Sequence, residues 1–140
     1  MATKPMLWYQ VDLASSVFKL SDVPPYNECT VRFSCNKDIA QFRAWSVFGK
    51  YTGEEKGLKI VEFTNRPKDV ELSFKINRAQ HLTLGEGLYS ILLFVQDTEG
   101  LWNQFYFFFT TEANGTNLRF CESDGDPLEI SDPRPEPEPL

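Results

Sequence analysis

The sequence predicts an all-β domain, built as an antiparallel sandwich or barrel of seven to eight short strands, and three observations lead to this prediction. First, apolar and polar side chains alternate along several short segments, which is the pattern of strands with one buried face. Second, clusters of Gly, Pro, Asn and Asp separate these segments. Third, 14% of the 140 residues are aromatic, which favours half-buried pleated surfaces. A chain of this length is expected to form one domain.

Two segments show the alternation most clearly. In residues 29–35 every second side chain is apolar, and the residues between them are Thr, Arg and Ser. Residues 70–77 repeat the pattern, and we expect their core side chains to be Val70, Leu72, Phe74 and Ile76. Further strands are expected at residues 7–13, 41–51, 58–64, 88–97 and 102–111.

Residues 113–140 differ in composition from the rest of the chain. They carry seven acidic side chains and two arginines, a net charge of −5 within a total of −6. Residues 133–139 place Pro at every second position, which predicts an extended, solvated, acidic and Pro-rich C-terminal tail. We therefore divide the chain into a β-domain over residues 1–112 and a tail over residues 113–140. The nearly neutral domain offers no basic track to a phosphate backbone, so nucleic acid is not an expected partner.

A local motif sharpens the prediction of the fold. Leu84, Gly87 and Tyr89 are spaced as Leu-x-x-Gly-x-Tyr directly before an apolar strand. This motif resembles the tyrosine corner of immunoglobulin-like domains, in which the Tyr hydroxyl bonds to backbone a few residues upstream. The resemblance covers residues 7–112 and implies an immunoglobulin-like antiparallel β-sandwich with Trp45 as its core tryptophan. It implies that strands B, C, E, F and G correspond to residues 29–35, 41–51, 70–77, 88–97 and 102–111.

The cysteines depart from the antibody pattern. Ile91 stands where an antibody domain has Cys, two residues after Tyr89, so the disulfide between the sheets is absent. Cys29 and Cys35 lie on one predicted strand, roughly 20 Å apart, and Cys121 makes the number odd, so buried free thiols are expected. The closer resemblance is to disulfide-free immunoglobulin-like or fibronectin-like modules of bacterial surface proteins and of bacteriophage capsids and tails.

The lack of export signals favours the phage version of this resemblance. No apolar run is long enough to span a membrane, and residues 1–16 lack the continuous apolar stretch of a signal peptide. A virion part that assembles inside a host cell needs neither a signal peptide nor disulfides. We therefore expect synthesis in a host cytoplasm, a place in the virion and no membrane association.

Few residues offer catalytic or metal-binding chemistry. His81, the one histidine in the sequence, is expected in the loop before Tyr89, and a lone surface histidine is expected to be inert. Asp124 and Asp126 flank a glycine but lack the further oxygen ligands of a calcium loop, so a solvated turn is the stronger interpretation. We expect no enzyme activity, no catalytic residue, no cofactor and no metal.

The last two predicted strands carry more apolar residues than one buried face requires. If Ile91 faces the core, the residues next to it in sequence point outward. Four outward side chains would then be neighbours and form an apolar patch: Leu92, Phe94, Tyr106 and Phe108. We expect this patch to be a protein interface. The alternative is that the chain covers the patch itself, with residues 6–9 or with Leu118 and Phe120.

These features indicate a non-enzymatic structural or interaction module. The expected setting is a bacteriophage virion, as a capsid decoration, head-fibre or tail-associated protein. The expected partners are copies of the chain itself or a larger shell or tail protein, in a homo-oligomer or larger assembly. The alternative is a carbohydrate-binding or cell-surface adhesion module, in which Trp45 or Trp102 stacks on a glycan beside Asn103 and Gln104. An enzyme on the same scaffold is a third hypothesis, because a fold does not determine function.

Overall fold

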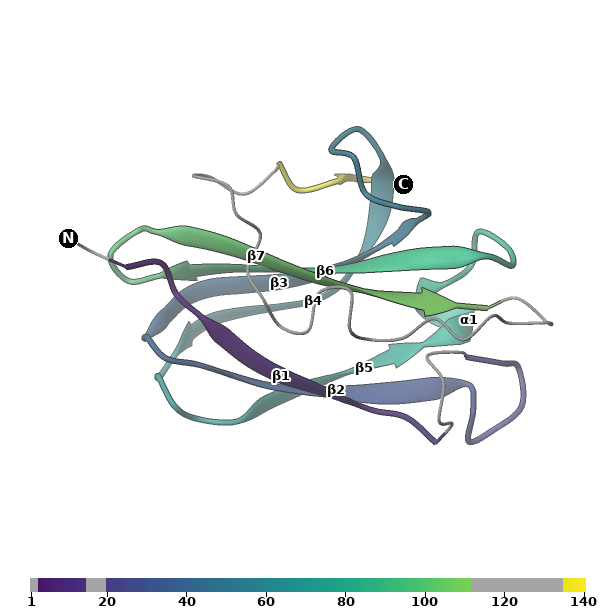
Figure 1. Ribbon diagram of the computed structural model, residues 1–140, viewed down its shortest axis with the longest axis horizontal. Coiled ribbons are helices and arrows are strands. Elements are labelled where there is room, and N and C mark those ends of the chain that lie inside the picture. The colour runs from purple at the N-terminus through teal and green to yellow at the C-terminus, as the bar shows by residue number, and fades with distance from the viewer. Residues whose placement is uncertain (1–2, 15–19, 112–134) are drawn as a thin grey trace.

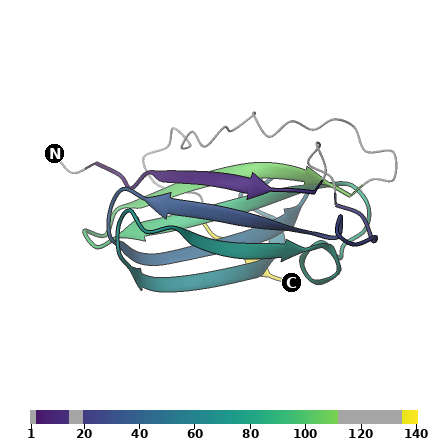
Figure 2. The ribbon, with the colours of Figure 1, turned by 90° about the horizontal axis from the view of Figure 1, so that it is seen from below.

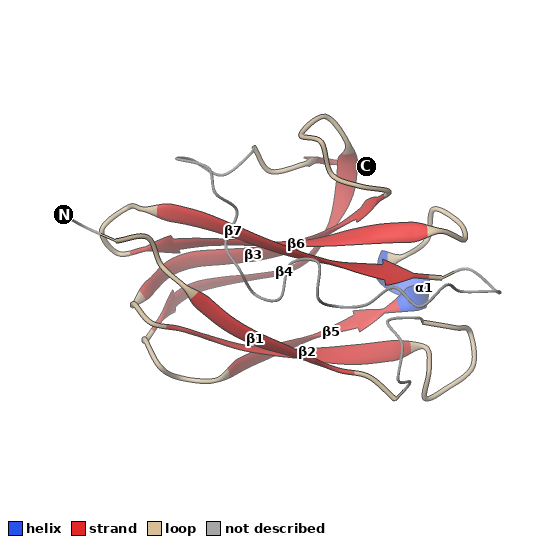
Figure 3. Cartoon of the chain, viewed as in Figure 1, coloured by secondary structure: helices blue, strands red, loops and turns tan. Residues whose placement is uncertain are grey.

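The computed structural model describes residues 3–14, 20–111 and 135–140, which form two β-sheets stacked face to face (Figure 1). The smaller sheet has the order β1–β2–β5, with β1 at Leu7–Asp12, β2 at Glu28–Cys35 and β5 at Leu72–Asn77. The larger sheet has the order β7–β6–β3–β4–β8, with β3 at Ile39–Phe48, β4 at Lys56–Arg66, β6 at Leu88–Asp97, β7 at Trp102–Thr110 and β8 at Glu138–Pro139. A one-turn helix, α1 at Arg78–His81, joins β5 to β6 (Figure 3).

The predicted all-β architecture is confirmed. Seven expected segments form strands, and each strand begins and ends within three residues of its expected bounds. Neighbouring strands are antiparallel except β4 and β8, which are parallel. The strand axes of the two sheets are roughly aligned with each other (Figure 2), as in aligned sheet packing. The short strand β8, at the edge of the larger sheet, is not predicted by the alternation of apolar and polar residues.

Aromatic side chains from both sheets form the core between the two layers. Phe33 of β2 and Phe42 of β3 stack with ring centroids 4.2 Å apart, and both are fully buried. Phe74 of β5 packs edge-on to Phe33, with centroids 5.9 Å apart. Strands β6 and β7 contribute alternate residues, namely Ile91, Leu93, Val95, Phe105, Phe107 and Phe109. The inward faces of these two strands are therefore those that the alternation predicts.

Strand β5 begins two residues later than the alternation predicts. Val70, expected in the core, is 44% exposed, because the residues before Leu72 belong to the turn that follows β4. In this turn Asp69 has a left-handed φ of 59°, and its N–H donates to the Cys35 carbonyl at 2.8 Å. The expectation for Val70 is wrong because this turn takes the first positions of the apparent strand.

Trp45 is buried, but it does not lie between the two sheets. Phe42 and Ala44 of β3 face the core, so alternation places Trp45 on the opposite, outer face of the larger sheet. The prediction of Trp45 as the core tryptophan is therefore wrong, and Phe42 fills the space between the sheets at this strand.

The hydroxyl of Tyr89 forms two hydrogen bonds with the backbone of the loop before β6. It accepts a hydrogen bond from the Leu84 N–H and donates one to the Gly85 carbonyl, both 2.9 Å long. Gly87 has a left-handed φ of 150°, and a Cβ there would lie 3.1 Å from the Phe48 ring. The Leu84 side chain is exposed, so this residue holds the loop through its backbone. The three residues of the motif thus define one loop conformation.

Tyr89→Phe is expected to lower the free energy of unfolding by about 1–2 kcal/mol, because the Leu84 N–H loses its partner and the Gly85 carbonyl keeps only the bond from the Thr111 hydroxyl. Tyr26→Phe is the matched control, since Tyr26 is 45% exposed, and it should change stability by less than about 0.5 kcal/mol. Urea denaturation followed by circular dichroism measures both values. Equal stability of the two variants would contradict the role given to the Tyr89 hydroxyl.

Cys29 and Cys35 are buried on the core side of β2 and form no disulfide. Burial raises the pKa of the Cys29 thiol to about 12, and it also raises the pKa of Cys35. The third cysteine, Cys121, lies outside the described residues. The expectation of buried free thiols is therefore confirmed for the two cysteines of β2.

In a Cys121→Ser background, the folded protein is expected to react with Ellman's reagent at least about a hundredfold more slowly than the urea-unfolded chain. The reason is that the reactive species is the exposed thiolate, and both remaining thiols are buried and protonated. The rate of absorbance change at pH 8 measures the reaction. A fast native reaction that consumes one thiol per chain would show that β2 is open to solvent.

Candidate functional site

The outer face of the five-stranded sheet carries a second apolar cluster. Its buried members are Trp45, Val47, Tyr51, Leu92 and Phe94, with Trp102 and Tyr106 partly buried against them. The strand register explains this grouping. Trp45 lies opposite Leu92, and Leu92 lies opposite Tyr106, in one row across β3, β6 and β7. The next row places Arg43 opposite Phe94, within reach of its neighbours on the same face.

The predicted apolar patch lies on this face, but it is not open to solvent. Leu92 and Phe94 are each 1% exposed, Phe108 is 9% exposed and Tyr106 is half-buried. Tyr106 and Phe108 contact each other edge to face, with ring centroids 5.4 Å apart. The expectation of an exposed patch is therefore wrong, because side chains of β3 and of the loop after it pack on the same face.

The C-terminal segment, residues 135–140, lies on this side of the sheet. Strand β8 pairs with the start of β4, with Lys56 opposite Glu138 and Gly57 opposite Pro139. The Leu140 N–H donates to the Gly57 carbonyl at 3.1 Å. Most of these residues are exposed, but the prediction of a solvated tail does not hold for Glu136 and Pro137, which are half-buried and buried, because the edge of β4 offers backbone groups for pairing. The rest of the predicted tail, with Leu118 and Phe120, lies outside the described residues.

Glu136 makes the most specific contacts of the C-terminal segment. One carboxylate oxygen accepts a hydrogen bond from Trp45 Nε1 at 2.7 Å, and the other forms an ion pair with Arg43. Arg43 Nε also donates to Glu62, at 2.7 Å. Burial works against the charge of Arg43, but the bonds to Glu62 and Glu136 outweigh it and raise the pKa of the guanidinium. Two carboxylates therefore hold a charged guanidinium beside the Trp45 indole.

Tyr51 holds the start of the C-terminal segment. Its hydroxyl donates to the Pro135 carbonyl, and its ring belongs to the buried cluster. The loop that carries Tyr51 is folded around Glu55, whose carboxylate accepts hydrogen bonds from the N–H and the hydroxyl of Thr52 and from the Gly53 N–H. This network involves no residue of the C-terminal segment and orders the loop directly after Tyr51.

The carboxyl of Glu55 is expected to titrate near pH 2 in the folded protein. Burial alone would raise its pKa, but the hydrogen bonds from Thr52 and Glu54 lower it from 4.5 to about 2. Because the folded pKa is depressed, the contribution of Glu55 to stability is complete above about pH 4.5 and is lost as the pH falls toward 2. An NMR titration of the carboxyl carbon measures the midpoint, and Thr52→Val should shift that midpoint upward. A midpoint near 4.5 in the wild type would show that the loop is not folded around Glu55.

Gly57 allows the C-terminal segment to approach the sheet. A Cβ at this position would lie 2.7 Å from the Ser46 carbonyl oxygen and 3.4 Å from the Cβ of Pro137. Pro137 is itself buried. Any larger residue at position 57 would therefore push β4 away from β3 at the place where the segment binds.

The alternating prolines suit a strand that pairs on one side. Successive residues of a strand direct their N–H groups to opposite sides, and proline has no N–H. Pro135, Pro137 and Pro139 therefore all lack the donor on the same side, whereas the Leu140 N–H points to β4 and binds there. The segment can pair with β4 but cannot donate to a further strand on its outer side.

No sequence pattern singles out the residues that build this site. Arg43, Tyr51, Gly57 and Glu136 belong to no motif, and more than 75 positions of the chain separate the first three from the last. The Pro-x-Pro alternation is the one local signal that could have indicated a one-sided edge strand. It does not indicate which strand would receive it.

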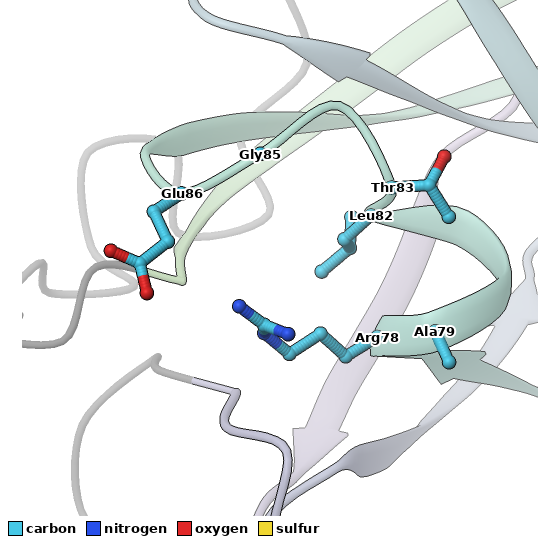
Figure 4. A pocket seen from close by; sticks show the side chains of 6 residues that line it. All are labelled: Arg78, Ala79, Leu82, Thr83, Gly85 and Glu86. Atoms are coloured by element: carbon cyan, nitrogen blue, oxygen red, sulfur yellow. The ribbon is translucent and has the colours of Figure 1, made fainter.

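A second candidate is a pocket of about 270 Å³ between α1 and the loop before β6. It is lined by Arg78, Ala79, Leu82, Thr83, Gly85 and Glu86, and Figure 4 shows the Arg78 guanidinium directed toward the side on which Glu86 lies. Arg78 forms an ion pair with Asp22. Because both signs of charge border the opening and the arginine is already paired, the pocket selects neither an anion nor a cation.

The residues considered for catalysis and metal binding do not come together. His81 is half-buried at the end of α1, and burial lowers its pKa. Asp124 and Asp126 lie outside the described residues. Within residues 3–14, 20–111 and 135–140, no group of three or more His, Cys, Asp or Glu side chains is placed to hold a metal ion.

The residues considered for glycan binding are largely enclosed. Trp45 is 5% exposed and Trp102 is half-buried. Asn103 and Gln104 are buried, and Asn103 Nδ2 donates to the Pro5 carbonyl at 2.9 Å. Trp45 offers no open face on which a sugar ring could stack.

Comparison of the chain with protein-family models, with curated proteins and with solved structures finds no match. In the part of the chain that the structure describes, no helix has the length and apolar character needed to cross a membrane.

Proposed function

We propose that this protein is a non-enzymatic structural and interaction module of the immunoglobulin-like class, and that it is a component of a bacteriophage virion. In this role it serves as a capsid decoration, head-fibre or tail-associated protein and works through contacts with other protein chains. The class is supported by the strand order β1–β2–β5 facing β7–β6–β3–β4, by the Tyr89 hydrogen bonds and by the unpaired Cys29 and Cys35.

One observation supports the interaction role above all others. The outer face of the larger sheet holds an extended segment through an ion pair, an indole hydrogen bond, a tyrosine hydroxyl and backbone pairing at the edge of β4. Proteins that bind extended chains by strand addition combine the same elements, since backbone pairing supplies affinity and side-chain contacts supply specificity. A face of this kind is suited to protein contacts.

The carbohydrate-binding or adhesion alternative has less support. Its main candidate residue, Trp45, is buried and donates its indole N–H to Glu136. A glycan array on which the wild type binds and Trp102→Ala does not would favour this alternative.

The virion role is tested on particles. Gradient-purified particles from a culture that expresses the chain are expected to contain it in a fixed ratio to the major shell protein, measured by quantitative mass spectrometry. Immunogold labelling should place it on the particle surface. Its absence from particles, with the protein present in the cell lysate, would overturn the proposal.

A further inference from the structure

The contacts of the C-terminal segment do not depend on its belonging to the same chain. We name the surface formed by Arg43, Trp45, Tyr51 and the β4 edge at Lys56 and Gly57 the docking face. Its residues lie within positions 43–57, and the segment begins at position 135. The same segment from another copy would make identical contacts, which is the condition for exchange of an element between protomers.

The chain between β7 and the C-terminal segment is much longer than binding in the same molecule requires. The end of β7, at Thr110, and the start of β4 lie at the same end of the sheet, as the paired residues Leu88 and Thr110 and the paired residues Val47 and Gly57 show. The lateral distance across β6, β3 and β4 to β8 is four strand spacings, roughly 19 Å.

Residues 112–134 connect the two, and that many residues can reach roughly 75 Å when extended. A flexible connection of this length has a root-mean-square end-to-end distance of roughly 26 Å, close to the span, so the effective concentration of the segment at its own docking face is on the order of 1 mM. Binding to a neighbouring copy therefore competes best where copies lie close together.

The charges of the docking face and the backbone of the C-terminal segment are also compatible with binding between two copies. The docking face offers the Arg43 guanidinium, which also pairs with Glu62 of β4, and the segment offers the Glu136 carboxylate, so the guanidinium and the carboxylate pair when a segment binds. The prolines leave the outer side of β8 without donors, so a bound segment ends the sheet and does not recruit further strands. Exchange would thus link defined neighbours and would not lead to open-ended sheet growth.

We propose that the docking face of one copy binds the C-terminal segment of a second copy, so that copies are linked by exchanged C-terminal segments. This inference rests on the proposed function and names the partner of the same face, a second molecule of this chain. The exchanged form uses the contacts of the C-terminal segment described above, and its population rises with the local concentration of the protein.

Disulfide trapping in the full chain tests the exchange. Lys56 and Glu138 are paired residues in parallel strands and are both exposed, so cysteines at these positions can form a disulfide only when the segment is bound. One chain carries Lys56→Cys and an isotope-labelled chain carries Glu138→Cys, both with Cys121→Ser. The two are mixed at up to about 1 mM, the range of effective concentrations for flexible linkers, in a glutathione redox buffer.

The expected result is a cross-chain disulfide between the labelled and unlabelled peptides, identified by mass spectrometry. Its yield should be at least about ten times the yield obtained with Lys75→Cys, an exposed position on the other sheet. Adding Glu136→Lys to the chain with Glu138→Cys should reduce the yield, because the introduced ammonium group would face the Arg43 guanidinium. The double variant Lys56→Cys, Glu138→Cys should form the disulfide within one chain and shows that the paired geometry is correct.

A yield equal to that of the Lys75→Cys control would overturn the exchange, and so would a double variant that forms no disulfide. A chain that exchanges but is missing from particles would overturn the virion role alone. A chain that is present in particles but forms no cross-chain disulfide would overturn the exchange and leave the interaction module intact.

Discussion

Phe94→Ala is expected to lower the free energy of unfolding by about 3–5 kcal/mol, the range for removing a fully buried phenylalanine. Phe94 is 1% exposed and packs with Trp45, Leu92 and Tyr51 on the outer face of the larger sheet. An open protein interface would give a different result, since truncating an exposed side chain leaves the stability of the monomer almost unchanged. Urea denaturation monitored by circular dichroism distinguishes the two cases.

Trp8→Ala is the matched control for Phe94→Ala. Trp8 is also an aromatic residue of a strand, but it is 55% exposed, so its loss should cost less than about 1 kcal/mol. The double variant Phe94→Ser, Phe108→Ser should fail to fold, because it replaces two buried aromatic rings by small hydroxyl side chains. A double variant that keeps the wild-type unfolding midpoint would show that this face is a surface and would restore the prediction of an exposed patch.

The strands and the inner core could be predicted because they depend on local alternation. Strand β6 has the predicted bounds, Leu88–Asp97, and its odd-numbered residues, from Tyr89 to Val95, face the core. The hairpin to β7 follows from Asp97 and Gly100. The Asp97 carboxylate accepts hydrogen bonds from the Leu101 N–H and the Glu99 N–H, and Gly100 has a left-handed φ of 92°. Such signals lie within a few residues of the structure they specify.

The errors share a different cause. Alternation correctly separates the two faces of β3 and β6, but it does not reveal whether a given face meets the other sheet, water or a distant part of the chain. The family resemblance places Trp45 on the wrong face, although Phe42 and Ala44 already determine its direction. Alternation places Leu92 and Phe94 on the right face, but their burial depends on packing that no local pattern indicates.

The docking face shows this limit most clearly. Arg43 lies in a strand, Tyr51 in a loop and Gly57 at the start of a strand, and each residue is ordinary for its element. Glu136 is one of seven acidic residues in a region that composition alone describes as a solvated tail. The residues at positions 43–57 and the C-terminal segment form a site only when β8 pairs with β4. This pairing joins residues that are distant in the sequence, so no local pattern indicates it.

Ending the chain after Arg134 is expected to lower the free energy of unfolding by about 2–3 kcal/mol. The change removes the ion pair to Arg43, the hydrogen bonds to Trp45 and Tyr51 and the pairing with β4, each a contribution of about 1 kcal/mol. Ordering the segment opposes these contributions, although three of its six residues are prolines with little freedom to lose, and burial of Pro137 and of the Trp45 ring adds to them, so the net effect is smaller than the sum of the favourable contributions. A tail that is merely solvated would leave the stability unchanged.

Fluorescence separates the loss of the segment from a general loosening of the fold. The Trp45 indole is buried and hydrogen-bonded, so the truncated chain should show a red-shifted emission maximum before any denaturant is added. Trp102 packs against the same cluster, so both chains carry Trp102→Phe, and adding Trp45→Phe to the truncated chain should then remove the shift, because the remaining Trp8 is exposed. Glu136→Ala should reproduce part of the destabilisation, whereas Glu138→Ala, with an exposed side chain, should not. If Glu138→Ala had the larger effect, the segment would be held by its backbone and not by the recognition of Glu136.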